Sequence, residues 1–420
     1  MFWSNETRFP TVADTMSRNR FDNLRTFFHV NDNTEMLPRE QKDHDKLFKV
    51  RPFLNYIRSN MRKIHVEEFT SVDEIIIPFK GRTLMKQYNK NKPHKWGIKL
   101  FAIASKSGIV HDFEIYIGKG TLPPSEHGLG ISGDVVMRLS ECIPKNENYK
   151  LSMDNWFNSY NLQCKLKYEG ILSVGTVRSN RIAGCPLEND KTIKSKGRGY
   201  FDYSVDTENK IVVTKWLDNK IVHVISNYKG PLPVENVKRW SVAQKHNVEV
   251  PRPAAIGEYN SYMGGIDLHD MLVELYRVNI RVRRFYLRII YHLLDMCVVN
   301  SWLLYRRHCK QLNMKKYISL IKFKSEIAHA LLLSGKNKPN KRGRPLSTTP
   351  PKPKKRLFTP RPVDDVKYDE TAHWPIPIDK KQRCKHCINA YTTMTCNKCN
   401  MHLCLTKSRM CFIAFHRKQP

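Results

Sequence analysis

Six of the 11 cysteines lie close together near the C-terminal end of the chain, between Cys384 and Cys411. This stretch holds two Cys-x2-Cys pairs and then further cysteines and a histidine: Cys384, Cys387, Cys396, Cys399, Cys404, Cys411 and His416. Such spacing is typical of structural zinc sites, in which four Cys or His ligands surround each ion. The first residues of the chain show no apolar core of a secretory signal, which favours metal ligation over disulfides. The C-terminal stretch is therefore predicted to be a Zn²⁺ module.

Seven ligands exceed the four that one tetrahedral ion takes, so we expect two interleaved sites. The eighth ligand is then His402 or a water molecule. A RING-type ubiquitin ligase finger also has interleaved zinc sites, but the order of His and Cys in this chain fits that pattern poorly. The five other cysteines are scattered, and most are expected to be buried small hydrophobic residues.

The charge of the chain indicates its class of partner. The 72 Lys and Arg residues outnumber the 39 Asp and Glu residues, which gives a formal net charge of +33. A field of this sign favours nucleic acid first and an anionic membrane surface a distant second. The most apolar long stretch, 286–307, is interrupted by His292, Asp295 and Asn300. It is therefore interpreted as a buried helix, and no membrane partner is expected.

The hydrophobic patterning changes several times along the 420 residues, which are enough for two or three domains. Helical spacing of apolar residues dominates at the start, strand patterns follow from Thr70, and long helices resume near Gly265. The predicted segments are a helical region at 1–69, the first part of an α/β sheet domain at 70–180, a β-rich insertion at 181–256, the domain end with a helical region at 257–335, a basic proline-rich linker at 336–380, and the cysteine-rich module at 381–420.

The linker carries two short basic motifs. Arg342, Gly343, Arg344 and Pro345 form the core of an AT-hook, in which arginines enter the narrow A·T minor groove and glycine lets the backbone follow the groove floor. The alternative is an ordinary solvated basic linker. The second motif resembles a nuclear localisation signal and comprises Lys352, Lys354, Lys355 and Arg356. Nonspecific phosphate contact is the alternative there, and salt-sensitive DNA affinity follows from either.

Four aspartates stand out in this basic chain. Asp73 lies inside an apolar strand pattern, and Asp154 follows the predicted strand 149–153 directly. Asp267 opens a predicted helix, with Asp270 about one turn further on. Asp154 and Asp267 can each be explained as helix-capping residues. Asp73 is harder to explain in that way, because a buried carboxylate without a partner is unfavourable.

A shared chemical role would explain the set of aspartates. Hydrolysis and transfer of a DNA phosphodiester use two divalent metal ions, one for the attacking and one for the leaving oxygen. Mg²⁺ prefers carboxylate oxygens, and bound cations relieve the repulsion between crowded carboxylates. Sequence spacing alone does not bring the aspartates together.

Three blocks of sequence resemble the catalytic blocks of piggyBac transposases, in the same order. The first runs from Ser71 through Asp73 to Arg82 and continues at 91–99 with Lys-Trp-Gly-Ile-Lys. The second combines Asp154-Asn155-Trp156-Phe157 with 175–180, and the third runs from Tyr259 through Asp267 to Asp270. The match covers nearly the whole chain.

The resemblance implies an RNase H-like catalytic domain with a β-rich insertion before the third aspartate. It assigns metal coordination, by Mg²⁺ or Mn²⁺, to Asp73, Asp154 and Asp267, and a supporting acidic role to Asp270. It also implies cut-and-paste transposition: strand nicking by water, a hairpin intermediate, and joining of a 3′ hydroxyl at a TTAA target. The flanking helices would serve dimerisation and DNA binding, and a cross-braced cysteine-rich domain would help recognise transposon ends. A nuclear homodimer acting on double-stranded DNA is expected.

The sequence departs from the family pattern at three places. The N-terminus is expected to be truncated, without the long acidic leader common in the family and without part of the first helical region. Met263 stands where many relatives have a lysine, and Lys407 falls where a ligand histidine is expected, so one zinc site is predicted to be incomplete. A domesticated protein that binds DNA without cutting it is the alternative function. All four aspartates are present, and this favours an intact catalytic site.

Overall fold

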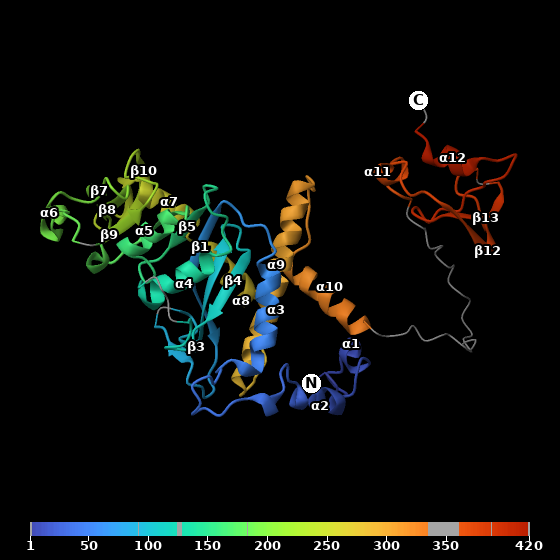
Figure 1. Ribbon diagram of the computed structural model, residues 1–420, viewed down its shortest axis with the longest axis horizontal. Helices are drawn as coiled ribbons and strands as arrows, with labels where there is room; N and C mark the ends of the chain where they lie inside the picture. The colour runs from blue at the N-terminus through green and yellow to red at the C-terminus, as the bar shows by residue number, and fades with distance from the viewer. Residues whose placement is uncertain are drawn as a thin grey trace. The chain divides into compact units, whose positions relative to one another are not determined.

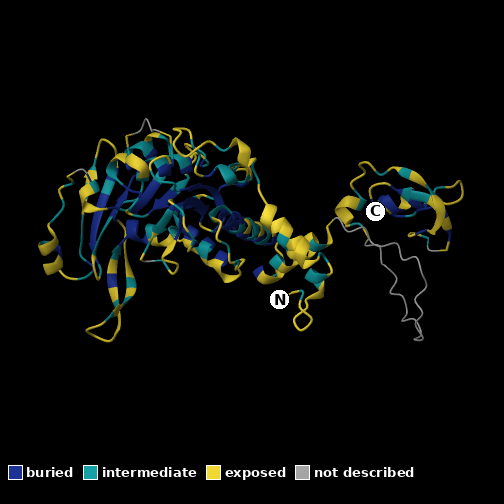
Figure 2. Cartoon of the chain, turned by 90° about the horizontal axis from the view of Figure 1, so that it is seen from below, coloured by how far each residue is buried: buried dark blue, intermediate teal, exposed yellow. Residues whose placement is uncertain are grey.

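The computed structural model describes residues 2–90, 92–123, 128–182, 184–334, 361–387 and 389–418. The chain divides into two compact units, Met1–Lys336 and Asn337–Pro420 (Figure 1). Each unit has its own buried residues, which appear in dark blue in Figure 2.

A nine-stranded sheet forms the centre of the N-terminal unit, in the order β2-β3-β1-β5-β6-β9-β8-β7, with β4 also paired to β3. The strands β1, β5 and β6 are parallel, whereas β3 runs antiparallel to β1 and β4. This mixed α/β arrangement is RNase H-like, as the sequence predicted. The strands span β1 Phe69–Pro78, β2 Lys86–Tyr88, β3 Trp96–Ser105, β4 Val110–Ile115, β5 Lys150–Met153, β6 Leu172–Thr176, β7 Phe201–Asp206, β8 Ile211–Leu217 and β9 Ile221–Ser226.

Helices cover both faces of this sheet and bury two separate apolar clusters. One cluster joins the face bearing Ile75 and Leu100 to α3, α8 and α9, and the other joins the face bearing Val72 and Phe101 to α4 and α5. Strands alternate their side chains between faces, so an apolar strand covered on both sides has a nearly continuous hydrophobic sequence. The helices of this unit are α1 Pro10–Ala13, α2 Arg18–Phe27, α3 Arg51–Met61, α4 Gly130–Ser140, α5 Tyr160–Tyr168, α6 Asp190–Ser195, α7 Ala254–Tyr262, α8 Gly265–Leu275, α9 Phe285–Gln311 and α10 Leu320–Leu333, with 3₁₀ turns at Asn33–Glu35, Phe48–Val50 and Ser179–Arg181.

The predicted insertion at 181–256 is not a separate sheet in its first half. Its strands β7, β8 and β9 extend the central sheet, because β9 pairs with β6. Only β10 Val234–Ser241 and β11 His246–Pro253 form a two-stranded sheet of their own. The sequence predicted β structure in this segment but could not show how its strands pair, since pairing depends on residues distant in sequence.

Fewer apolar residues of the N-terminal helical region are buried than the sequence predicted. Ile57 of α3 is buried in the core, but Phe27 and Phe28, which follow helical spacing with Phe21, are exposed. The apolar periodicity correctly predicted helices here, yet α2 has no buried residue.

The predicted buried helix at 286–307 is α9, Phe285–Gln311. This is the one helix in the described part of the chain that is long and apolar enough to cross a membrane, by length and composition alone, and 67% of its apolar window is buried inside the fold. Its Leu293 and Met296 have no exposed surface. Within this unit, α9 is a core helix.

His292 of α9 gives the fold a pH dependence. Its ring is buried, neither nitrogen has a hydrogen-bond partner, and burial followed by the charge of Arg288 lowers its pKa to about 3. An unfolded histidine has a pKa of about 6.5, so the unfolded state takes up the proton first as the pH falls. Stability is therefore full above pH 6.5 and declines below it.

We expect this one group to remove about 2 kcal/mol of unfolding free energy between pH 7 and pH 5. Chemical denaturation at several pH values measures the slope. In His292→Leu the slope should be shallower, whereas His329→Leu, at an exposed position of α10, should leave it unchanged. An identical slope in the native chain and His292→Leu would disprove this assignment.

The C-terminal unit begins earlier than the predicted boundary at 381. It contains α11 Asp364–Lys367, a two-stranded sheet of β12 Pro375–Arg383 and β13 Tyr391–Cys396, and α12 Cys411–His416. Its buried cluster consists largely of cysteines with Met401, Leu403, Phe412 and Phe415. Residues that were predicted to be linker thus form part of a folded unit.

Candidate active site and metal-binding groups

The pairing of β1 with β5 brings the first two aspartates to neighbouring positions. The parallel register places Val72 beside Met153, so Asp73 and Asp154 follow at the same level of the sheet. Asp154 leaves the end of β5 in a turn, where its side chain accepts a hydrogen bond from the backbone N–H of Trp156. Asp73 and Asp154, from strands that are far apart in sequence, therefore lie side by side where β5 ends.

Helix α8 adds the third aspartate. Strand alternation places Asp73 on the same face as Ile75 and Ile77, and this face packs against α8. Asp267 lies in the first turn of α8, and Asp270 follows one turn later. Gly265 allows the close approach, because a Cβ there would lie 2.5 Å from the carbonyl oxygen of Ser105.

The charges around Asp73 show that the three aspartates share one environment. Burial raises the pKa of Asp73 to about 7, the N–H of Glu74 and the charge of Lys92 oppose this, and Asp267 and Asp154 raise it further. Burial also raises the pKa of Asp270, with Lys92 opposing and Asp267 contributing. Carboxylates that raise one another's pKa lie close together, and a bound cation would relieve their repulsion.

A cleft opens beside α8 and is lined by Lys92, Pro93, His94, Asp267 and Asp270 together with Ile76, Met271, Glu274 and Leu275. The Lys92 Nζ lies 3.6 Å from a carboxylate oxygen of Asp267. Asp267 is exposed to this cleft, with 69% of its side-chain surface accessible. The third aspartate is thus open to a ligand, whereas Asp73 lies deeper.

The donor set fits divalent cations that prefer oxygen. All the converging side chains are carboxylates, which are the ligands that Mg²⁺ favours. In the described residues, however, these aspartates do not bring three ligand atoms within 4.8 Å of one another, as the Cys and His groups do. Tyr259 of α7 joins the site: burial raises its pKa to about 12, and Asp154, Asp73 and Asp267 raise it too. The sequence placed Tyr259 in the third block without giving it a role.

The C-terminal unit gathers its cysteines and histidines into two groups of four. One consists of Cys384, Cys387, Cys404 and Cys411, and its ligand atoms all lie within 4.8 Å of one another. The sulfurs of Cys387 and Cys404 are 3.9 Å apart. Four sulfurs at this spacing fit a tetrahedral metal ion.

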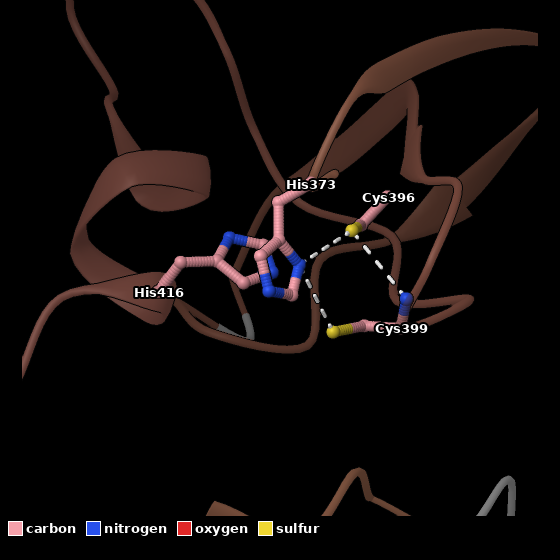
Figure 3. A group of neighbouring side chains, drawn as sticks. All are labelled: His373, Cys396, Cys399 and His416. Atoms are coloured by element: carbon pink, nitrogen blue, oxygen red, sulfur yellow. Dashed lines mark hydrogen bonds between the residues drawn. The ribbon is translucent and has the colours of Figure 1, made fainter. Parts of the chain in front are cut away.

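The other group consists of His373, Cys396, Cys399 and His416 (Figure 3). The Nδ1 of His373 lies 3.4 Å from the sulfurs of both Cys396 and Cys399. Its Nε2 donates to Asp369 at 2.9 Å, and since a carboxylate only accepts, Nδ1 keeps a free lone pair. The Asp369 carboxylate thereby orients the ring so that Nδ1 faces the two sulfurs.

His416 has the same division of roles between its nitrogens. Nδ1 donates to the carbonyl of Phe412 at 2.8 Å, while Nε2 is buried and has no hydrogen-bond partner. A buried nitrogen without a partner is unfavourable unless it binds a ligand. The geometry of both histidines therefore fits a metal ion in this group.

The two groups interleave along the chain, as the sequence predicted, but two expectations about them were wrong. His402 belongs to neither group, and His373 completes the second one. The backbone of His402 bridges to Thr395 beside β13, and its side chain is not among the clustered ligands. Neither group is incomplete, because His373 supplies the fourth ligand.

Other predicted residues lie outside the described residues. Both motifs of the basic linker, Arg342 to Pro345 and Lys352 to Arg356, fall within 335–360.

Comparisons with known proteins agree with this geometry. The family model described as Transposase IS4 matches residues 1–302. The human piggyBac transposable element-derived protein 3 is 31% identical over 411 residues, covering 96% of this chain and 65% of that protein. The human piggyBac transposable element-derived protein 2 is 30% identical over 393 residues, covering 92% of this chain and 62% of that protein. The chain therefore spans less than two thirds of the length of these relatives.

A solved structure is similar in fold. The cryo-EM structure of a piggyBac transposase synaptic complex with hairpin DNA superposes with a TM-score of 0.64 at 19% identity, covering 97% of this chain and 82% of that one. With the family match over 1–302 and the two human relatives, this chain belongs to the piggyBac-type transposase family.

Proposed function

We propose that this chain binds double-stranded DNA and catalyses cleavage and transfer of phosphodiester bonds with Mg²⁺ or Mn²⁺. The observation that carries the proposal is that Asp73, Asp154 and Asp267, from β1, the end of β5 and α8, lie near enough to influence one another's charge, with Asp267 lining a cleft. Asp270, one turn further along α8, would have a supporting acidic role at this site. By its resemblance to the family, the reaction is cut-and-paste transposition at TTAA-type targets.

In this mechanism Asp73, Asp154 and Asp267 would hold the divalent ions. When bound, such ions stabilise the charge on the attacking and leaving oxygens of the phosphate. Asp73 must be deprotonated to bind a cation, and its raised pKa means that it holds a proton in the free protein below about pH 7. Lys92 beside Asp267 is placed to contact a phosphate that enters the cleft.

Double-stranded DNA is the proposed partner because of the net charge of the chain and the cleft beside α8. The net charge of +33 provides sequence-independent attraction to the phosphate backbone. The AT-hook motif Arg342–Pro345 would add a preference for A/T-rich minor grooves, and the motif Lys352–Arg356 would direct the protein to the nucleus. A homodimer that assembles on transposon ends is proposed with them.

We also propose Zn²⁺ as the metal of the C-terminal groups. Four thiolates in one group and two thiolates with two imidazoles in the other are ligand sets that tetrahedral Zn²⁺ takes. By the family resemblance, the unit helps to recognise transposon ends.

The second candidate function is a domesticated protein that binds DNA without cutting it. The ion pair between Lys92 and Asp267 favours this alternative. A lysine that pairs with a metal-binding carboxylate competes with the metal ion for that carboxylate. The two functions share DNA binding and differ only in cleavage.

Asp73→Asn separates these functions. Asn has the shape of the protonated carboxyl, so the variant should fold while it loses the negative charge. We expect the native chain, loaded with Zn²⁺, to nick supercoiled DNA that carries transposon ends when Mg²⁺ or Mn²⁺ is added but not without them. The variant should nick roughly 10³-fold more slowly and bind DNA equally well. Equal binding with no cleavage by either protein would favour the domesticated function.

A further inference from the structure

The short hairpin of β2 and β3 connects two features of the surface. At its loop end, Lys92, Pro93 and His94 line the aspartate cleft. At the start of β2, Lys86 lines a second hollow, which Phe285 of α9 also lines. In between, β2 pairs with the beginning of β3, with Tyr88 opposite Trp96.

Tyr88 and Trp96 form an exposed aromatic pair on this hairpin. Their ring centroids are 4.9 Å apart, yet 54% of Tyr88 and 51% of Trp96 remain accessible. The Nζ of Lys86 lies 5.2 Å from the centre of the Trp96 ring. The pair therefore presents open ring surface and positive charge together.

The second hollow is strongly basic. Its charged lining residues are all cationic or histidine, with no carboxylate among the described residues that line it: Arg39, His44, Lys46, Arg82 and Lys86. Phe285, at the start of α9, closes the hollow from the other side. Such a surface attracts a phosphate backbone.

The aromatic pair lies on the catalytic face of the sheet. Along β3, Trp96 shares a face with Ile98 and Leu100, and this face also bears Asp73, which pairs with Ala102. Trp96 follows His94, which lines the aspartate cleft, by two residues. The aromatic pair therefore lies next to the cleft along the chain.

We propose that Tyr88 and Trp96 form a stacking platform for an unpaired base of a DNA strand that runs from the aspartate cleft to the basic hollow. The proposal rests on the proposed function, since it concerns the same DNA. Bases inside a duplex are already stacked, so an open aromatic surface between phosphate-binding cations favours a single-stranded segment. Lys92 on one side and Arg82 and Lys86 on the other would contact the phosphates before and after the stacked base.

The test measures binding to two DNAs in a buffer without Mg²⁺ or Mn²⁺, so that it does not depend on cleavage and the C-terminal Zn²⁺ stays bound. One is a blunt duplex, and the other is the same duplex with a six-nucleotide single-stranded extension, prepared with either polarity. For the full-length chain loaded with Zn²⁺, Trp96→Ala should weaken binding to the extended DNA by about fivefold or more and leave blunt-duplex binding unchanged. Trp96→Phe keeps a ring and should restore most of the difference.

A matched control is Trp240→Ala, because Trp240 is 57% exposed on β10, outside this hairpin. It should leave the ratio of the two affinities unchanged. A 2-aminopurine placed at successive positions of the extension should be quenched at one position by the native chain and not by Trp96→Ala. Equal weakening of both DNAs by Trp96→Ala, or no quenching at any position, would overturn the platform. If the native chain bound neither DNA, the platform and the proposed function would both fail, whereas equal weakening of both DNAs by Trp96→Ala would overturn the platform alone.

Discussion

Removal of metal with a strong chelator should unfold the C-terminal unit while the N-terminal unit keeps its fold. The buried cluster of the C-terminal unit is small, and five of its members are cysteines that belong to the two metal groups, with Cys387 packed against it. Without an ion, the ligands lose their common partner and few apolar side chains remain to hold the unit. Structural zinc contributes on the order of 10 kcal/mol of folding free energy per ion in small domains.

The measurement is zinc content per chain, followed by the near-ultraviolet signal and proteolysis of the C-terminal unit. The native chain should hold two ions, and His373→Ala should hold one. His402→Ala should keep both, because His402 lies outside both groups. The reverse result, one ion in His402→Ala and two in His373→Ala, would show that the ligand set is wrong.

The strand and helix patterns predicted the α/β fold class, whereas the role of the aspartates came from the resemblance to piggyBac transposases. Buried strands have continuous apolar sequences, and a charged residue such as Asp73 inside one is rare enough to indicate function. The position of Asp154 directly after a strand also follows from local pattern. Their closeness does not, since it depends on the β1–β5 register and on the approach that Gly265 allows.

The site residues that could not be predicted from the sequence reach their sites only through the tertiary fold. His373 precedes the first Cys pair by 11 residues and lies in a segment that its composition marked as linker. His402 looked like a ligand because it stands next to cysteines in sequence. In the folded unit the pairing of β12 with β13 places Pro375 opposite Cys396, which brings His373 to Cys396, so closeness along the chain was a poor guide.

Replacing Asp154 by cysteine should change the metal that supports cleavage. A thiolate is a softer ligand than a carboxylate and binds Mg²⁺ poorly, whereas a transition-metal ion such as Mn²⁺ accepts it more readily. We expect Asp154→Cys to lose roughly 10³-fold or more of its cleavage rate in Mg²⁺ and to regain a substantial part in Mn²⁺. Asp154 lies in the turn that follows β5, so the small change in side-chain size should be tolerated.

Two controls separate metal binding from other roles of this side chain. Asp154→Ala offers no ligand and should be inactive with either ion. Asp134→Cys places a thiol on α4, outside the aspartate cleft, and should cut like the native chain with both ions. DNA binding without Mg²⁺ or Mn²⁺ should be the same for all of these proteins.

The most direct test of a metal-dependent active site is therefore the cleavage rate of the native chain, Asp154→Cys and Asp154→Ala, each in Mg²⁺ and in Mn²⁺. A metal site at Asp154 predicts that the native chain cuts with both ions, the cysteine variant only with Mn²⁺, and the alanine variant with neither. Equal cleavage by all three proteins in Mg²⁺ would contradict it.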